Sequence, residues 1–346
     1  MKQTGIIKLA GLLFGASLLW IGLPGSPFFE AVPGVLTLSA NSTGAEIQAA
    51  LDSLPPNGEL VLSPGTYEIR HPLMLRHDFL TLRGSGPATI LRLADQANCP
   101  VVILGPQLSG ALRPVQHLRL ADLLMDGNRK NQDAEFWRAA ADGSQINNNG
   151  VQIWNATDII VENIVCCHCR SGGLVAAGVL RLFLRDFDAF DNQFDGLACY
   201  QTKESHFQGL RLHDNLAAGI SLDLAFIHNF IRDAVLAGNN LGVFMRDSRD
   251  NLFQGLTILK SQGDGVFIAQ ATAPTPNGWQ LSPGTQCTGN SFSELTVDGC
   301  GGRAFQVNND SCTNNFISVA HFMGNLRGGL GQMDRNLVRV RDLVEY

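Results

Sequence analysis

The stretch "DNQFDGLACY" (Asp191–Tyr200) returns 23 residues later as "DNLAAGISLD" (Asp214–Asp223), with its Asp-Asn start and its glycine in the same places. The same interval separates six glycines along the chain: Gly150, Gly173, Gly196, Gly219, Gly242 and Gly265. After each glycine the first and third residues are apolar, as in "GVQIW" and "GVFMR". A period of two is typical of a strand that buries one face, and its regular return indicates stacked repeat units.

A second apolar stretch recurs in the latter half of each unit, beginning at His228, Asp250, Gly289 and Asn314. An asparagine stands two places before a phenylalanine in three copies: Asn251/Phe253, Asn290/Phe292 and Asn314/Phe316. Units this short have no room for a crossover helix, which excludes an ordinary parallel sheet. Each strand can instead pair with its counterpart one unit later, so the pattern predicts a β-solenoid with equivalent positions about 4.8 Å apart.

Two residue types in the turns carry further expectations for this coil. We expect the repeat glycine to supply a turn conformation that a side chain would resist. Asn192 and Asn215 share one offset in successive units, so we expect them to form a short amide ladder along the turn.

The region ahead of the repeats resembles the opening of the pectin lyase-like superfamily. The motifs that carry the resemblance are "AEIQAALDSLP", "LSPGTYEI" and "LTLRGSGPATIL" within Gly44–Asp95, and "LLMDGNR" at Leu123–Arg129. The resemblance covers roughly Gly44–Gly329 and implies an all-β fold, a right-handed parallel β-helix with an N-terminal capping helix. It leaves the activity open, because the superfamily contains lyases, hydrolases, epimerases and non-catalytic proteins.

The two ends of the predicted solenoid need covers, since open ends present unpaired strand edges. For the N-terminal helix the apolar residues available are Ala45, Ile47, Ala49, Ala50, Leu51 and Leu54. The tail "NLVRVRDLVEY" from Asn336 is the candidate for the other end. We therefore divide the chain into an N-terminal segment (1–30), one β-helix domain (31–335) and a C-terminal cap or tail (336–346).

The N-terminal segment predicts export. Lys2 and Lys8 precede an apolar run from Leu9 to Leu23 that ends at Pro24. This is typical of a signal peptide, with an uncleaved membrane anchor as the alternative and a buried helix less favoured. We expect a secreted, periplasmic or envelope-associated protein, monomeric, that touches a membrane only through this segment. The net charge of -6 disfavours nucleic acid as a partner.

The eight cysteines are compatible with an oxidising compartment. The run Cys166, Cys167, His168 and Cys169 has the residue types of a metal site. Zinc ligands are usually separated by two or more residues, and no second pair follows at a suitable distance. We therefore predict buried thiols or a disulfide, with no metal and no cofactor.

Because inward residues of a solenoid form its core, chemistry must come from outward positions. Aligned on the glycines, the fourth residues include Trp154, Tyr200, Asp223 and Arg246, and the second residues include Phe244 and Phe267. Asp195 and Asp264 precede their glycines, and Lys203 and Asp247 follow their strands. Aromatic rings stack on sugars, carboxylates transfer protons and cations bind uronates. This row therefore predicts a site for a polysaccharide or oligosaccharide.

Two long insertions flank the row and strengthen this interpretation. They cover Gly127–Asn149 and Ala271–Asn290 and carry Trp137 and Trp279. Long loops in compact repeats are usually functional and gather on the binding face. We predict that Asp195, Tyr200, Asp223, Arg246 and Asp264 are catalytic. We predict that Trp137, Trp154, Lys203, Phe244, Asp247, Phe267 and Trp279 bind substrate.

Known members of the superfamily do not settle the activity. Asp195 and Arg246 occupy positions comparable to catalytic residues of polygalacturonases, but the Asp-Asp pair, Gly-His-Gly and Arg-Ile-Lys motifs are absent from the sequence. The Asp-Pro-His motif of alginate epimerases is also absent, and the calcium-binding pattern of pectate lyases is not evident. Our hypothesis is an exported polysaccharide-active enzyme, either a glycoside hydrolase or a uronate lyase or epimerase. The alternative is a non-catalytic glycan binder, adhesin or envelope scaffold.

Overall fold

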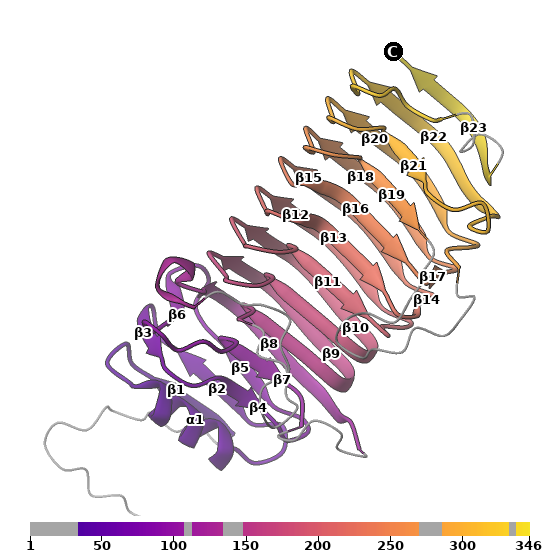
Figure 1. Ribbon diagram of the computed structural model, residues 1–346. Coiled ribbons are helices and arrows are strands. Elements are labelled where there is room, and N and C mark those ends of the chain that lie inside the picture. Colours follow the sequence, from indigo (N-terminus) through magenta and orange to yellow (C-terminus); the bar gives the residue numbers. More distant parts are fainter. Residues whose placement is uncertain (1–33, 107–112, 134–147, 270–285, 332–336) are drawn as a thin grey trace, which may run out of the picture.

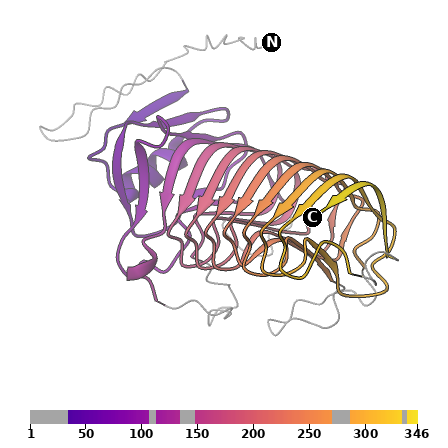
Figure 2. The same cartoon turned by 90° about the horizontal axis from the view of Figure 1, so that it is seen from above.

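The computed structural model describes residues 34–106, 113–133, 148–269, 286–331 and 337–346. These residues form one elongated right-handed parallel β-helix, as the repeats and the superfamily resemblance predicted. Figure 1 shows its coils following one another from the helix α1 to the C-terminal strand β23, and Figure 2 shows the same stack from above. The predicted segment 1–30 lies outside the described residues.

The strands follow in chain order. The first coils hold β1 (Val35–Leu38), β2 (Glu59–Leu62), β3 (Gly65–Ile69), β4 (Leu73–Leu75), β5 (Thr81–Arg83), β6 (Thr89–Leu93), β7 (Val102–Leu104), β8 (Val115–Asp126) and the short 3-10 helix Arg129–Asn131. The middle coils hold β9 (Val151–Cys167), β10 (Leu174–Phe190), β11 (Leu197–Tyr200), β12 (His206–His213), β13 (Ala218–Asp223), β14 (Phe226–Ile227), β15 (Phe230–Ala237), β16 (Leu241–Arg246) and β17 (Ser248–Arg249). The last coils hold β18 (Leu252–Leu259), β19 (Val266–Ala269), β20 (Ser291–Asp298), β21 (Phe305–Val307), β22 (Asn315–Met323) and β23 (Val338–Glu345).

Each coil turns its corners at residues with left-handed backbone. One such column runs through Asp186, Gly209, Asp233 and Gly255, with φ between 50° and 67°. Glycine and the short acids and amides adopt this conformation at low cost. A corner of this kind lets the strand continue on the next face, which is why β9 and β10 are long and bent.

The repeat glycines have a different role from the one predicted. None of the six, all of which the structure describes, has a positive φ. Instead, successive coils approach one another closely at these positions. A Cβ on Gly150 would lie 2.7 Å from the carbonyl oxygen of Gly173, and one on Gly173 would lie 2.6 Å from that of Gly196. Close backbone approach, and not turn conformation, requires glycine in this column.

The predicted amide ladder is confirmed and is longer than expected. Asn192 Nδ2 donates to Asn215 Oδ1 at 2.9 Å, and Asn215 Nδ2 donates to Asn239 Oδ1 at 3.0 Å. All three side chains are buried. Each rung therefore satisfies amide groups that would otherwise be costly to bury.

A second ladder runs through the latter half of the units. It joins Asn229, Asn251, Asn290 and Asn315 through hydrogen bonds of 2.9–3.1 Å. The predicted Asn314/Phe316 pair was therefore one residue out of register. Asn314 takes a left-handed conformation (φ 59°), and Ile317 is the partner of Phe292 in the sheet.

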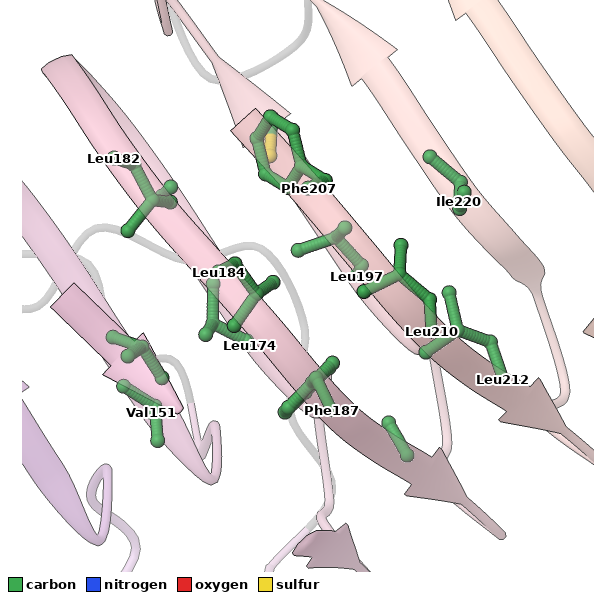
Figure 3. Packing of buried hydrophobic residues seen from close by; sticks show 14 of the residues in the cluster. Val151, Leu174, Leu182, Leu184, Phe187, Leu197, Phe207, Leu210, Leu212 and Ile220 are labelled. Atoms are coloured by element: carbon green, nitrogen blue, oxygen red, sulfur yellow. The ribbon is translucent and has the colours of Figure 1, made fainter. Parts of the chain in front are cut away.

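The core is a continuous column of apolar side chains inside the coil. Val151, Leu174, Leu197 and Ile220 are ladder partners in successive coils, and Figure 3 shows these residues in neighbouring strands. Each is fully buried. Burying one such side chain contributes about 1.5–3 kcal/mol, so the stack stabilises itself coil by coil.

The helix α1 (Gly44–Ser53) lies at the N-terminal end of the stack, as predicted (Figure 1). Thr43 and Glu46 form a capping box, with Glu46 N donating to Thr43 Oγ1 at 3.2 Å. Ile47, Ala50 and Leu51 are buried, whereas Ala45 and Ala49 are exposed, so the apolar face is narrower than expected. The buried side of the helix covers the first coil at the N-terminal end of the β-helix.

At the other end the predicted tail is part of the β-helix. Val338–Glu345 forms β23, which pairs in parallel with β22 as the last strand of the stack. The described residues contain no helix that is long and apolar enough to cross a membrane.

Candidate functional site

The predicted row of outward residues exists. Trp154 pairs with Ala177, Ala177 with Tyr200, and Tyr200 with Asp223 in successive coils. Arg246 follows one coil later, where its Nε donates to Asp223 Oδ2 at 2.9 Å. The row therefore lies across β9, β10, β11, β13 and β16, which are neighbours in Figure 1.

Asp223 is the most enclosed member of the row, with 2% of its surface exposed. Besides Arg246, it accepts a hydrogen bond from the backbone N–H of Leu224 at 2.8 Å. Burial raises the pKa of this carboxyl, while Arg246 and the Leu224 N–H oppose the rise. The carboxylate is thus held in place by its neighbours.

Two aromatic rings lie beside this ion pair. Phe244 and Phe267 stack at 5.9 Å between ring centroids, with planes 7° apart. The Arg246 guanidinium carbon lies 5.2 Å from the Phe244 centroid, within the range of a cation–π contact. Both rings are half-buried, which leaves part of each ring open to a ligand.

Tyr200 stands between the acidic groups of the row. Burial raises the pKa of its phenol above the ordinary value, and the charges of Asp195 and Asp223 raise it further. The phenol is therefore protonated at neutral pH and can donate a hydrogen bond.

Asp195 and Asp264 hold one coil to the next. Asp195 Oδ1 accepts from Ala218 N at 2.8 Å, and Asp264 Oδ1 accepts from Arg303 N at 2.7 Å. Burial raises the pKa of Asp195 to about 7. The two carboxylates stand three coils apart, which is roughly 14 Å by strand spacing.

Lys203 and Asp247 are not brought into the row. The strand of the row ends at a left-handed corner formed by Gln201, Leu224 and Asp247. Lys203 is exposed beyond this corner, where it bridges to Leu180 and Ile227. Asp247 is 4% exposed, so its carboxylate does not offer a binding surface. Trp137 and Trp279 lie outside the described residues.

A second cluster was missed by the sequence analysis. One ligand atom from each of Asp126, Cys167 and His168 lies within 4.8 Å of the others. Thiolate, imidazole and carboxylate are all donors that first-row transition metals accept. The expected absence of metal rested on the spacing within the Cys-Cys-His-Cys run, but Asp126 comes from the previous coil. Asp126 is the ladder partner of Cys167 but lies 41 residues before it, outside the 23-residue interval, so the repeat alignment did not reach it.

The expected disulfide is not formed, since all eight cysteines are free in the structure. Most of these thiols are buried, in agreement with the other prediction made for them, buried free thiols.

Comparison with known proteins shows the family of the chain. Residues 126–325 match the family described as periplasmic copper-binding protein (NosD). The chain belongs to the NosD family. Asp126, Cys167, His168 and the row from Trp154 to Arg246 all lie within the matched residues. The description of the NosD family as periplasmic agrees with the export expected from the N-terminal sequence. No curated protein matches the sequence.

Solved structures similar to this NosD family member share its fold. The A-module of mannuronan C-5 epimerase AlgE4 from Azotobacter vinelandii is 16% identical, with 84% of this chain and 94% of that chain covered and a TM-score of 0.52. The N-terminal fragment of bacteriophage phi29 gene product 12 is 12% identical (83% and 55% covered, TM-score 0.59). The periplasmic alginate epimerase AlgG is 10% identical (91% and 79% covered, TM-score 0.50). At these identities the likeness shows the fold alone.

Proposed function

We propose that this protein binds a polysaccharide chain across β11, β13, β16 and β19 and acts on it near Tyr200, Asp223 and Arg246. The observation that carries the proposal is the arrangement of these three side chains on successive coils beside the stacked Phe244 and Phe267. Side chains at equivalent positions recur from coil to coil along the axis, and this arrangement suits a ligand that is itself a chain of repeating units. The rings offer apolar area to sugar faces, and the polar groups offer hydrogen bonds and protons.

The spacing and contacts of the aspartates argue against hydrolysis. Glycosidases place two carboxyl groups about 5–9.5 Å apart on either side of the bond. Asp195 and Asp264 are roughly 14 Å apart by strand spacing, and Asp223 is engaged by Arg246 and Leu224 N. This spacing argues against a hydrolase built on these aspartates.

A lyase or epimerase needs a base, an acid and a group that stabilises the uronate carboxylate. Asp195, whose pKa is raised to about 7, can take up a proton near neutrality. Tyr200 is the candidate acid, because its raised pKa keeps the phenol protonated at neutral pH. Arg246, with a third of its side chain exposed, supplies the cation. Mannuronan and alginate epimerases have the same fold, which supports a polysaccharide as the ligand.

The experiment is incubation of the purified protein with a panel of neutral and uronate polysaccharides. Absorbance of unsaturated ends reports a lyase and uptake of solvent deuterium reports an epimerase. New reducing ends that form without unsaturated ends report a hydrolase. Tyr200→Phe should abolish the first two signals, whereas Asp233→Asn, a change at an exposed corner of another face, should leave them intact. Reducing ends that form without unsaturated ends, and that persist in Tyr200→Phe, would contradict the proposal.

A non-catalytic glycan binder is the competing function. It is favoured by the structural contacts of Asp195, Asp223 and Asp264, each of which accepts a backbone hydrogen bond. In that case Phe244→Ala should weaken polysaccharide binding, while the panel gives no product signal with the wild type.

We also propose copper binding as a second function of the chain. The description of the NosD family suggests it, and the cluster of Asp126, Cys167 and His168 is the specific observation that favours it. Copper uptake by the whole chain, measured by equilibrium dialysis, is its test.

A further inference from the structure

We propose that Asp126, Cys167 and His168 are the ligands of one copper ion at a corner of the β-helix. This inference rests on the proposed copper-binding function and assigns it a site. Neither the family match nor the fold names these residues.

The stacking of the coils brings the first two donors together. Asp126 ends β8 and Cys167 ends β9, and the two are partners in the parallel ladder. Side chains of ladder partners point the same way and stand about 4.8 Å apart. The Cys167 side chain is nearly buried and Asp126 is half-buried, so both donors are fixed by the fold.

The corner supplies the third donor. Successive residues of a strand normally point to opposite faces. His168 follows Cys167 but has a left-handed backbone, with φ of 52°. The corner thereby lets adjacent side chains converge, so that the sulfur, an imidazole nitrogen and a carboxylate oxygen meet within 4.8 Å.

The imidazole lies between two carboxylates. His168 Nδ1 is 3.4 Å from Asp126 Oδ1, and His168 Nε2 is 3.6 Å from Asp191 Oδ2. Asp191 is held in turn by Arg129, whose Nη2 donates to Asp191 Oδ1 at 2.8 Å. Metal-bound histidines commonly donate their other N–H to a carboxylate, which orients the ring. Asp191 is placed to be that positioning residue.

The remaining contacts of Asp126 are compatible with this role. Its Oδ1 accepts from Asn128 N at 2.9 Å, and its Oδ2 lies 3.4 Å from Arg92 Nε. These contacts orient the carboxylate. The Arg92 charge opposes a cation, but a carboxylate and a thiolate together supply two negative charges against a divalent ion.

The donor set and its exposure favour copper. A thiolate and an imidazole suit soft and borderline ions, and copper is the strongest binder among divalent first-row metals. His168 has 47% of its side chain exposed, which gives an ion a route from solvent. Binding replaces the thiol proton: the copper–sulfur bond forms, the S–H bond breaks and one proton is released to water. No electron is transferred in this step.

The test is titration of the purified full chain with copper(II) under anaerobic conditions, followed by calorimetry and visible absorption. Cobalt(II) serves as a second, redox-inert probe. We expect one equivalent bound with a sulfur-to-metal charge-transfer band. Cys167→Ser should abolish the band, and His168→Asn and Asp126→Asn should weaken affinity at least tenfold. Asn is chosen at position 168 because it tolerates the left-handed backbone.

Matched controls separate the site from general effects. Cys169→Ser removes a buried thiol of the same run that is not one of the three donors, and His213→Gln removes a histidine one coil beyond Asp191. Both should bind copper as the wild type does, with circular dichroism and melting temperature confirming the fold of every variant. Asp191→Asn should weaken binding but keep the band, because it acts through His168.

The outcomes are distinct for the two proposals. One copper bound with unchanged affinity by Cys167→Ser and His168→Asn overturns this site, while copper binding by the chain stands. A wild type that takes up neither copper nor cobalt overturns both. If Cys167→Ser does not fold, His168→Asn decides, because that side chain is half exposed and is not part of the core.

Discussion

Arg246 Nε donates a 2.9 Å hydrogen bond to Oδ2 of Asp223, the carboxylate of the preceding coil that is only 2% exposed. The pair joins two coils at the centre of the row and places a fixed cation beside Tyr200 and Phe244. Breaking a buried ion pair from one side is costly, because it leaves the other charge without compensation.

Arg246→Met should therefore destabilise the protein by about 3 kcal/mol at pH 8. Burial already raises the pKa of Asp223, and loss of Arg246 raises it further. In the variant the folded state takes up this proton more readily than the unfolded state, so stability recovers as the pH falls. Urea denaturation at pH 8 and pH 5 measures the difference. Equal losses at both pH values would contradict this account of the pair.

Asp195→Asn should make the protein more stable at pH 8. Because the folded pKa is about 7 against an ordinary value of 3.8, the folded state binds the proton more tightly. Ionisation of Asp195 therefore costs stability as the pH rises from about 4 to 7, and the full cost is present above 7. The amide oxygen of Asn can keep the hydrogen bond from Ala218 N.

We expect a gain of roughly 2 kcal/mol at pH 8 and none at pH 4, less than the full shift because the group is partly exposed. Thermal melts at the two pH values check this. Asp233→Asn, at an exposed corner, is the control and should show no such pH dependence. A gain of equal size at both pH values would refute a raised pKa for Asp195.

Gly173→Ala should destabilise the β-helix by about 1–3 kcal/mol through overpacking. The new methyl group would stand 2.6 Å from the carbonyl oxygen of Gly196 and 2.8 Å from the Ala189 side chain. Chemical denaturation measures the loss. An unchanged free energy of unfolding would show that neighbouring coils can move apart at the glycine column without loss of stability.

Asn239→Ala should cost about 2–3 kcal/mol, since it leaves the backbone and side-chain amides of Asn215 buried without their acceptor. Asn240→Ala is the matched control, because that neighbouring side chain is exposed. Hydrogen exchange of the Asn215 amide gives a local measurement: it should accelerate in the first variant and stay unchanged in the second.

How far the sequence predicts this structure depends on whether the repeat interval stays constant. Tyr200, Asp223 and Arg246 could be placed in one row because each is 23 residues from the next, and a constant interval makes stacked positions equivalent. The register changes where residues are added, as between Asn290 and Asn315, which are 25 apart, and there the expected Asn314 was wrong.

Other features had no signal in the spacing. Glycine was expected in the repeat column, but the reason is the approach of the next coil, which only the three-dimensional stack reveals. Asp126 and Cys167 are 41 residues apart, outside the regular interval, so their contact could not be read from the period of the later coils. Asp247 is buried because it lies at a corner of the coil, and the alternation of apolar residues in the sequence does not predict where that corner is.

The central claim is that a polysaccharide lies along the face of β11, β13, β16 and β19. The most direct measurement is the affinity of the wild type, Phe244→Ala and Phe183→Ala for each polysaccharide of the panel by isothermal titration calorimetry. Phe183 is an equally large ring, 38% exposed, on another face of the coil. We predict that at least one polysaccharide binds the wild type, that Phe244→Ala weakens it about tenfold or more, in line with 1–3 kcal/mol for a stacking ring, and that Phe183→Ala leaves it unchanged. Binding that is indifferent to Phe244, or no binding across the panel, would contradict the claim.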